Sequence, residues 1–157
     1  MNTIFKKLNY KNQESIFIAN APESFKNEMK AMAKVAAIKT DWKGARSIDF
    51  FMGFVTRQSE VDSIAKSVGP LMSEDGLLWL CYPKGTSKKY TCEFNRDTGW
   101  TELGKAGYEP VRMVAVDEDW SALRFRRVEK IKKMTRSFAM TEAGKKKVAA
   151  TRKVKKK

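Results

Sequence analysis

The sequence contains no histidine, and this absence restricts the chemistry that is open to it. Histidine is the usual general base near neutral pH and the commonest metal ligand. Ser-His-Asp and Cys-His nucleophile systems are therefore excluded, and so are metal sites built on imidazole. Any catalysis would need carboxylates, lysines, a thiol or a cofactor.

Cysteine is nearly absent as well. Cys81 and Cys92 are too few and too scattered for a disulfide framework or a zinc site, so we expect neither a disulfide nor a bound metal. Few cysteines without a secretory segment suggest a reducing compartment. Cys81 lies inside an apolar run, where a thiol normally behaves as a small, inert hydrophobic side chain.

Long hydrophobic stretches are also missing. No segment approaches the roughly 18 consecutive apolar residues that a membrane-spanning helix requires. The first residues, Met-Asn-Thr-Ile-Phe-Lys-Lys-Leu, do not form a sustained apolar region of the signal-peptide type. We therefore predict a soluble, cytoplasmic protein without a membrane partner.

Positive charge is distributed unevenly along the 157 residues. Residues 1–128 hold 20 Lys/Arg and 16 Asp/Glu, whereas residues 129–157 hold 12 Lys/Arg and 2 Asp/Glu, so most of the net charge of +14 lies in the last fifth of the chain. A lysine-rich segment with few apolar residues repels itself and cannot bury enough surface to fold. We expect a lead-in at 1–13, one folded domain at 14–128, and a lysine-rich tail at 129–157 that is disordered from about residue 137.

The apolar run Leu77-Leu-Trp-Leu-Cys-Tyr82 is the centre of the pattern. It does not alternate between apolar and polar residues, so both of its faces must be covered, as in a strand of a parallel sheet packed between helices. A turn-like segment, 73–76, precedes it, and Pro83 ends it before the basic loop 84–89. Ligands of open α/β sheets bind beyond the carboxyl ends of the strands, which is where this loop is expected.

The other segments alternate between strand and helix patterns. Apolar residues at Phe25, Met29 and Met32 have helical spacing, and a second such stripe begins at Val61. The link 117–120 is short enough to demand an antiparallel hairpin. Strands are predicted at 14–19, 34–39, 47–55, 77–82, 108–116 and 121–128, with helices after Asn20 (as N-cap), after Thr56 and after Asn95 (as N-cap). The third helix is expected to bury Trp100 and Leu103 and to end near Gly107. This alternation predicts a three-layer α/β domain with a mostly parallel sheet and a C-terminal antiparallel hairpin.

Three motifs carry a resemblance to a known fold family. They are Ile18-Ala-Asn-Ala-Pro-Glu23, Asp75-Gly-Leu-Leu-Trp-Leu-Cys-Tyr-Pro-Lys84 with Ser87-Lys88, and Ala115-Val-Asp-Glu-Asp-Trp-Ser-Ala-Leu-Arg-Phe-Arg126. With the order of elements, they make residues 8–128 resemble the class I methyltransferase-like Rossmann fold. More narrowly, the chain looks like the small bacterial domain-of-unknown-function family 3052. That resemblance implies a degenerate form of the fold and no established activity.

The departure from working methyltransferases concerns the loop after the first strand. In those enzymes this loop is rich in glycine, because a side chain there would occupy the volume of S-adenosylmethionine. Here Ala19-Asn-Ala-Pro-Glu23 contains no glycine. Asp41 stands where such enzymes hold the cofactor ribose with an acid, but a solvated turn aspartate is the better explanation, because acids are common in turns.

Two other clusters are candidate sites. The loop Lys84-Gly-Thr-Ser-Lys-Lys89 offers lysines, hydroxyls and backbone N–H groups to a small anion, although it lacks the spacing of a nucleotide-binding P-loop and can also be a plain basic surface loop. The three acids at 117–119 suit a hairpin turn better than a metal or acid/base site. The candidates for ligand or anion binding are Asn20, Asp41, Lys84, Thr86, Ser87 and Lys88.

The tail carries the strongest functional signal. Lysines on a flexible chain neutralise phosphates and release counterions, so they bind nucleic acid without reading its sequence. The candidates are Lys145, Lys146, Lys147, Arg152, Lys153, Lys155, Lys156 and Lys157. The leading interpretation is a non-enzymatic α/β binding domain whose basic tail binds nucleic acid non-specifically, which would make the protein nucleoid-associated. The simpler alternative is that the tail only increases solubility. The alternative function is an S-adenosylmethionine-dependent methyltransferase-like enzyme with an atypical cofactor loop.

Overall fold

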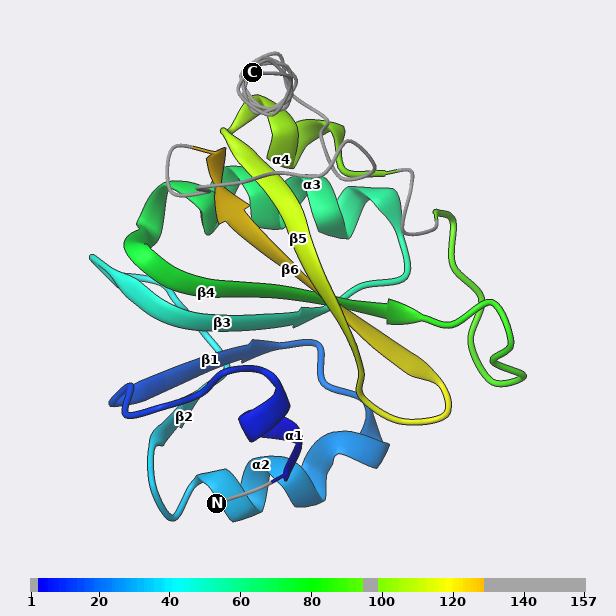
Figure 1. Ribbon diagram of the computed structural model, residues 1–157, viewed down its shortest axis with the longest axis horizontal. Coiled ribbons are helices and arrows are strands. Elements are labelled where there is room, and N and C mark those ends of the chain that lie inside the picture. Colours follow the sequence, from blue (N-terminus) through cyan, green and yellow to red (C-terminus); the bar gives the residue numbers. More distant parts are fainter. Residues whose placement is uncertain (1–2, 95–98, 129–157) are drawn as a thin grey trace, which may run out of the picture.

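The computed structural model describes residues 3–94 and 99–128, which form a mixed six-stranded sheet between two layers of helices (Figure 1). The strands are β1 (Ser15–Ala19), β2 (Ala37–Lys39), β3 (Ile48–Phe54), β4 (Met72–Pro83), β5 (Tyr108–Ala115) and β6 (Trp120–Arg127). The α-helices are α1 (Thr3–Lys7), α2 (Lys26–Met32), α3 (Gln58–Ser67) and α4 (Thr101–Lys105). Short 3-10 turns, Glu23–Phe25 and Gly69–Leu71, precede α2 and β4.

The strands lie in the order β2-β1-β3-β4-β6-β5. The first four are parallel to one another, and β6 runs antiparallel to both β4 and β5. The reversal at β6 follows from its short link to β5, since a parallel return would need a crossover of a dozen or more residues. The predicted three-layer α/β fold with a mostly parallel sheet and a C-terminal hairpin is confirmed.

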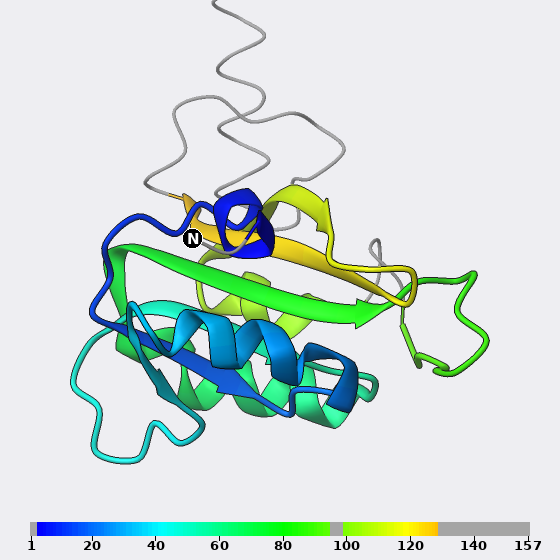
Figure 2. The same ribbon diagram turned by 90° about the horizontal axis from the view of Figure 1, so that it is seen from below.

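The unbroken apolar run of β4 is explained by the two helical layers (Figures 1 and 2). Successive strand residues point to opposite faces. Leu78 and Leu80 pack in the cluster that contains the apolar residues of α3 and α4, whereas Leu77, Trp79 and Cys81 pack in the cluster that contains those of α1 and α2. Both faces of β4 are therefore covered, as the sequence predicts.

The N-terminal segment differs from the extended lead-in that the sequence suggested. Thr3–Lys7 is helical, and Phe5 and Leu8 are fully buried. The ring of Phe5 lies 5.9 Å from those of both Phe25 and Phe50, so this segment packs on the face of the sheet and not on its edge. Tertiary burial of the apolar side chains stabilises a helix too short to form alone.

The helix after β1 also begins later than predicted. Asn20 is not its N-cap, because Ala21 and Pro22 are also non-helical and the cap position of the first turn is Pro22, with φ −71° and ψ 160°. Asn20 instead has φ +58°, a left-handed conformation that asparagine tolerates better than most side chains. The apolar stripe is as predicted, with Phe25 and Met32 buried and Met29 partly buried against them.

Two strand boundaries are corrections. Residues 34–36 do not belong to β2, because the N–H groups of Val35 and Ala36 still bond to the carbonyl oxygen of Met32 in the turn after α2. The segment 73–76 is not a turn: it lies within β4, where Met72 pairs with Ile48 and Leu77 with Phe50. The extra residues on β4 make the pairing with β3 irregular at this point. In the sequence, these residues have the composition of a turn.

The third helix is shorter than predicted. α4 covers Thr101–Lys105, with Trp100 and Leu103 buried as expected and Gly107 following at φ +90°. The proposed N-cap, Asn95, lies outside the described residues, and so does the tail beyond Val128. Within 3–94 and 99–128, no helix has the length and apolar character needed to cross a membrane.

Candidate functional site

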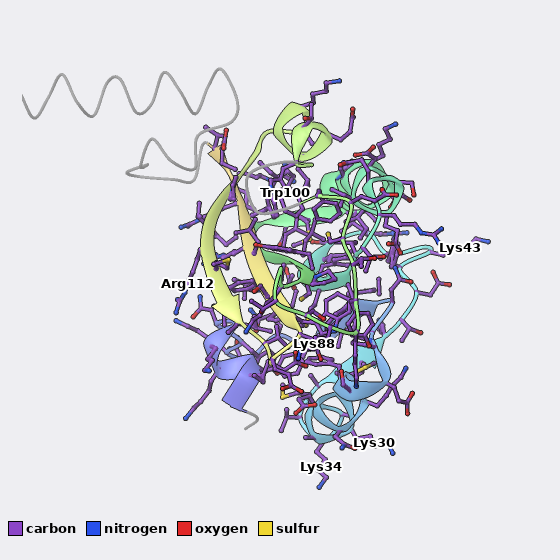
Figure 3. The ribbon with its side chains drawn as sticks, turned by 90° about the vertical axis from the view of Figure 1, so that its right-hand side faces the viewer. Lys30, Lys34, Lys43, Lys88, Trp100 and Arg112 are labelled. Atoms are coloured by element: carbon purple, nitrogen blue, oxygen red, sulfur yellow. The ribbon has the colours of Figure 1, made fainter. Side chains whose placement is uncertain are left out.

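The strand order places a switch point between β1 and β3. From β1 the chain moves outward to β2 on one side, and from β3 it moves to β4 on the other. In open α/β sheets, ligands bind at the carboxyl edge beside such a point. The arrowheads of β1, β3 and β4 in Figure 1 mark this edge, and Figure 3 views the molecule from that side. Asn20 follows β1, and Thr56 and Arg57 follow β3.

The carboxylate of Glu60, in the first turn of α3, occupies this point. Its Oε1 accepts hydrogen bonds from the backbone N–H groups of Thr56, at 2.9 Å, and Arg57, at 3.1 Å. The Thr56 hydroxyl donates to the same oxygen at 3.3 Å, and Asn20 Nδ2 lies 3.4 Å from Oε2. A side chain of the protein itself therefore takes up the main-chain donors that follow β3.

A second carboxylate, that of Glu93, lies against the same helix end. Its Oε2 accepts from the backbone N–H of Gln58 at 2.7 Å, while its own N–H donates to the carbonyl oxygen of Thr56 at 3.0 Å. The first N–H groups of a helix have no partner within the helix, and negative charge is favourable there. Two carboxylates thus satisfy the positive end of α3.

A polar hollow of about 300 Å³ lies beside this arrangement and is lined by Thr56, Arg57, Thr91, Cys92 and Glu93. Burial raises the pKa of the Cys92 thiol, and the charges of Glu93 and Glu60 raise it further, against a backbone hydrogen bond at Phe94 that lowers it. The thiol therefore stays protonated at neutral pH and is a poor nucleophile. No cluster of metal-ligating side chains exists in the part of the chain that the structure describes.

The predicted loop after β4 is bound to the β5–β6 turn. The backbone N–H of Lys84 donates to the carbonyl oxygen of Asp119 at 2.8 Å, and the Ser87 hydroxyl donates to its carboxylate at 2.9 Å. Thr86 and Lys88 are exposed at the same edge, and Figure 3 labels Lys88. The Ser87 hydroxyl, a candidate for anion binding, is therefore used to hold the loop in place.

The acids of the hairpin turn have a structural role. Asp117 Oδ1 accepts from the N–H groups of Asp119 and Trp120, at 2.8 and 2.9 Å, which is a self-bonded aspartate turn. Trp120 anchors this corner, with its ring 5.1 Å from that of Phe54 and 4.9 Å from that of Tyr90.

Asp41 lies just past β2, on an exposed turn. Its Oδ1 accepts from the N–H of Lys43 at 2.9 Å, which is the geometry of a turn aspartate. β2 is an edge strand and Asn20 follows its neighbour β1, so both candidates lie near the carboxyl edge. The hydrogen bonds of Asn20 and of the Lys84 loop go to different partners, and neither Asn20 nor Lys84 lines the hollow.

The residues that shape the switch point were missed in the sequence. They are Thr56, Arg57, Glu60, Cys92 and Glu93. One signal was available, because a glutamate at the third position of a helix commonly bonds back to the N-cap. Glu60 has this position relative to Arg57. No local signal indicates that Glu93, 35 residues from Gln58, would bond to the same helix end.

Three solved structures are similar to part of this chain. Ribosomal protein L11 methylase from Lactobacillus delbrueckii subsp. bulgaricus has a TM-score of 0.44 and 11% identity over 73% of this chain, which spans 58% of that protein. A TehB-like SAM-dependent methyltransferase from Corynebacterium glutamicum has a TM-score of 0.44 and 8% identity over 79% and 85% of the two chains. A protein of the NADB-Rossmann superfamily from Streptococcus agalactiae has a TM-score of 0.42 and 9% identity over 81% and 68%.

At TM-scores below 0.5 and identities of 11% or less, these likenesses transfer no activity to this chain. No family model matches the chain, and no curated protein matches it either.

Proposed function

We propose that this protein is a non-enzymatic α/β domain whose switch point is closed by its own side chains and whose lysine-rich tail associates with nucleic acid. The single observation that carries the first part is the position of the Glu60 carboxylate on the N–H groups of Thr56 and Arg57. Anionic ligands at the edge of an α/β sheet depend on such main-chain donors. Here the donors are occupied, and the carboxylate that occupies them repels an anion.

The loop after β1 supports the same conclusion. It contains no glycine, and Asn20 occupies its left-handed position with a side chain that extends toward Glu60. A ligand that approached the backbone here would have to displace this side chain. The thiol of Cys92, protonated by burial, does not supply a nucleophile to the neighbouring hollow.

The nucleic-acid part of the proposal rests on charge. The 12 Lys/Arg and 2 Asp/Glu of residues 129–157 make a polycation, and a polycation exchanges its counterions for phosphates regardless of base sequence. Under this proposal the chain is cytoplasmic and nucleoid-associated. Membership in family 3052, which the sequence motifs suggest, belongs to the proposal too and adds no activity to it.

The test compares the full chain with a chain that ends at residue 136. Fluorescence anisotropy with two duplexes of unrelated sequence should give similar affinities for the full chain, with a log–log salt slope of about −0.9 per phosphate neutralised. Truncation should abolish most of the binding, while Lys84→Ala with Lys88→Ala should change it little. A salt-insensitive preference for one duplex, or full affinity after truncation, would contradict the proposed role of the tail. Melting temperatures establish that each variant is folded.

A methyltransferase-like enzyme that uses S-adenosylmethionine is the second candidate. The observation that favours it is the strand order, which sets Asn20, Thr56 and Arg57 at a switch point beside a polar hollow, with Asp41 after the next strand. The names of the methyltransferases among the similar structures fit this candidate better than the first. Calorimetry of the full chain with S-adenosylmethionine separates the two: micromolar binding would establish a working cofactor site and overturn the non-enzymatic proposal.

A further inference from the structure

The second half of β6 exposes one face of the sheet. Trp120 to Leu123 are all buried, but from there burial alternates: Phe125 is fully buried, whereas Arg124 and Arg126 are half-buried. Because side chains alternate across a strand, the two arginines share the face opposite to Phe125. Figure 1 shows α1 in front of the lower part of the sheet and α2 below it, with no helix in front of the upper part of β5 and β6.

The strand register adds a third arginine to this face. Arg112 of β5 pairs directly with Arg124 of β6, and directly paired residues of antiparallel strands point to the same side. Arg112 is exposed, and Figure 3 shows it at the margin of the molecule on the outer side of β5. Arg112, Arg124 and Arg126 are called the arginine face below.

This face carries more positive charge than its surroundings neutralise. The carboxylate of Asp75 lies 4.0 Å from Arg126, and the buried Glu109 is the register partner of Arg126. Within the described ranges, neither Arg112 nor Arg124 has an ion pair. Like charges in direct cross-strand register destabilise a sheet.

Two of the guanidinium groups also have a buried donor without a partner in the part of the chain that the structure describes. The Nε atoms of Arg124 and Arg126 are buried and have no hydrogen-bond partner among the described residues. Burial lowers the pKa of Arg124, and the charges of Arg126 and Arg112 lower it further. An oxyanion placed over the three side chains would reduce this repulsion and accept the forked hydrogen bonds that guanidinium groups offer to phosphate.

The arginine face adjoins the start of the basic tail along the chain. β6 ends at Arg127, and the segment that holds 12 Lys/Arg begins at residue 129. A polyanion held by the tail is therefore brought to the end of β6 by chain connectivity alone. The face and the tail have the same electrostatic preference, so one partner can satisfy both.

The chemistry of this face favours nucleic acid over a lipid surface. Val35 and Met113 are the large apolar side chains exposed within the described ranges. Met113 pairs with Leu123 on the other side of the sheet, where its sulfur contacts the Tyr82 hydroxyl at 3.3 Å, so the arginine face has no apolar group to insert into a membrane. It offers no exposed aromatic ring on which a base could stack either, which favours contact with the phosphates of a duplex.

We propose that the arginine face is a docking surface for the phosphate backbone of duplex nucleic acid. This inference rests on the proposed function and deepens it: the tail recruits the duplex, and Arg112, Arg124 and Arg126 fix it against the β5–β6 hairpin. The arginines recognise phosphate by charge and by forked hydrogen bonds, so binding does not depend on the base sequence.

The test uses the full chain and a labelled duplex of about 20 base pairs, at several salt concentrations. Arg112→Gln with Arg126→Gln is compared with Lys30→Gln and Lys34→Gln, which remove the same charge from α2 and the turn after it. The arginine variant should bind about tenfold more weakly and lose roughly 1.8 from its log–log salt slope, because two phosphate contacts are removed. The lysine variant should retain the wild-type slope.

Each other outcome has a distinct meaning. Equal weakening by both variants would overturn the arginine face but leave tail binding intact, whereas no binding by the unmodified chain would overturn the proposed function together with this inference. A loss by the arginine variant of binding to vesicles with acidic phospholipid, with duplex binding unchanged, would reassign the face to a membrane. The exposed single variant Arg112→Gln, which should weaken binding about threefold, keeps the inference testable if the double variant fails to fold.

Discussion

The indole N–H of Trp79, in the middle of β4, donates a hydrogen bond of 3.0 Å to the backbone carbonyl oxygen of Leu8. The two residues are 71 positions apart, and both are fully buried. This bond satisfies the one polar atom of the largest buried side chain of the central strand. It also ties the N-terminal helix to the sheet, so the segment before β1 is part of the core.

Replacing Phe5 tests this role of the N-terminus. Phe5 is fully buried between Phe25 and Phe50, so Phe5→Ala should lower the free energy of unfolding by about 3–5 kcal/mol. Urea denaturation followed by tryptophan fluorescence measures the change. Lys7→Ala, on an exposed position of the same helix, should have little effect. Similar stabilities of the two variants would show that α1 is dispensable.

Removing the Glu60 carboxylate should expose its contribution to the switch point. Glu60→Ala leaves the N–H groups of Thr56 and Arg57 without their acceptor, and we expect a loss of about 1–2 kcal/mol in the free energy of unfolding. Ser59→Ala, at the exposed neighbouring position, is the matched control and should lie within about 0.5 kcal/mol of the wild type. If the two variants unfold at the same denaturant concentration, the carboxylate does not stabilise this end of α3.

Gly53 of β3 should resist even a methyl group. A Cβ at this position would lie 2.9 Å from Ile64 Cδ1 and 3.0 Å from Phe51 Cε1, which is closer than packed side chains allow. Gly53→Ala should therefore destabilise the protein by about 1–3 kcal/mol through overpacking. Gly85→Ala, where nothing lies within 4 Å, serves as the control, and its melting temperature should match that of the wild type. A tolerated Gly53→Ala would mean that the ends of the Ile64 and Phe51 side chains can shift at little cost.

The two thiols should react at different rates in the native protein. Burial raises the pKa of both, and that of Cys81 is well above its usual value, with Asp117 raising it further. The thiolate is the reactive form, so a raised pKa slows alkylation at neutral pH. The alkylation rate should therefore continue to increase with pH above about pH 9, where an ordinary thiol is already half ionised. Iodoacetamide labelling followed by mass spectrometry should modify half-buried Cys92 slowly and Cys81 only after unfolding. Modification of Cys81 in native Cys92→Ser at the rate of Cys92 would refute this order.

Periodicity predicted the elements that bury an unbroken or regularly spaced set of apolar residues. The run at 77–82, the stripe from Val61 and the short link before Trp120 each depend on neighbours in the sequence, and the structure confirms the central strand, α3 and the hairpin. Predictions failed where distant contacts decide. The apolar residues around Phe5 and Leu8 are too few to form a helical pattern in the sequence. Residues 73–76 have the composition of a turn, but they lie within β4 where its pairing with β3 is irregular.

For the candidate site, the sequence determined the ingredients, and only the tertiary structure decided their use. The absence of histidine, the glycine-free loop at 19–23 and the charge of residues 129–157 are properties of composition and hold in any conformation. The closure of the switch point by Glu60 and Glu93, and the alignment of Arg112 with Arg124, arise from the strand order and register. Hydrogen bonds and charges act over a few ångströms, so residues far apart in the chain acquire these roles only when the sheet brings them side by side.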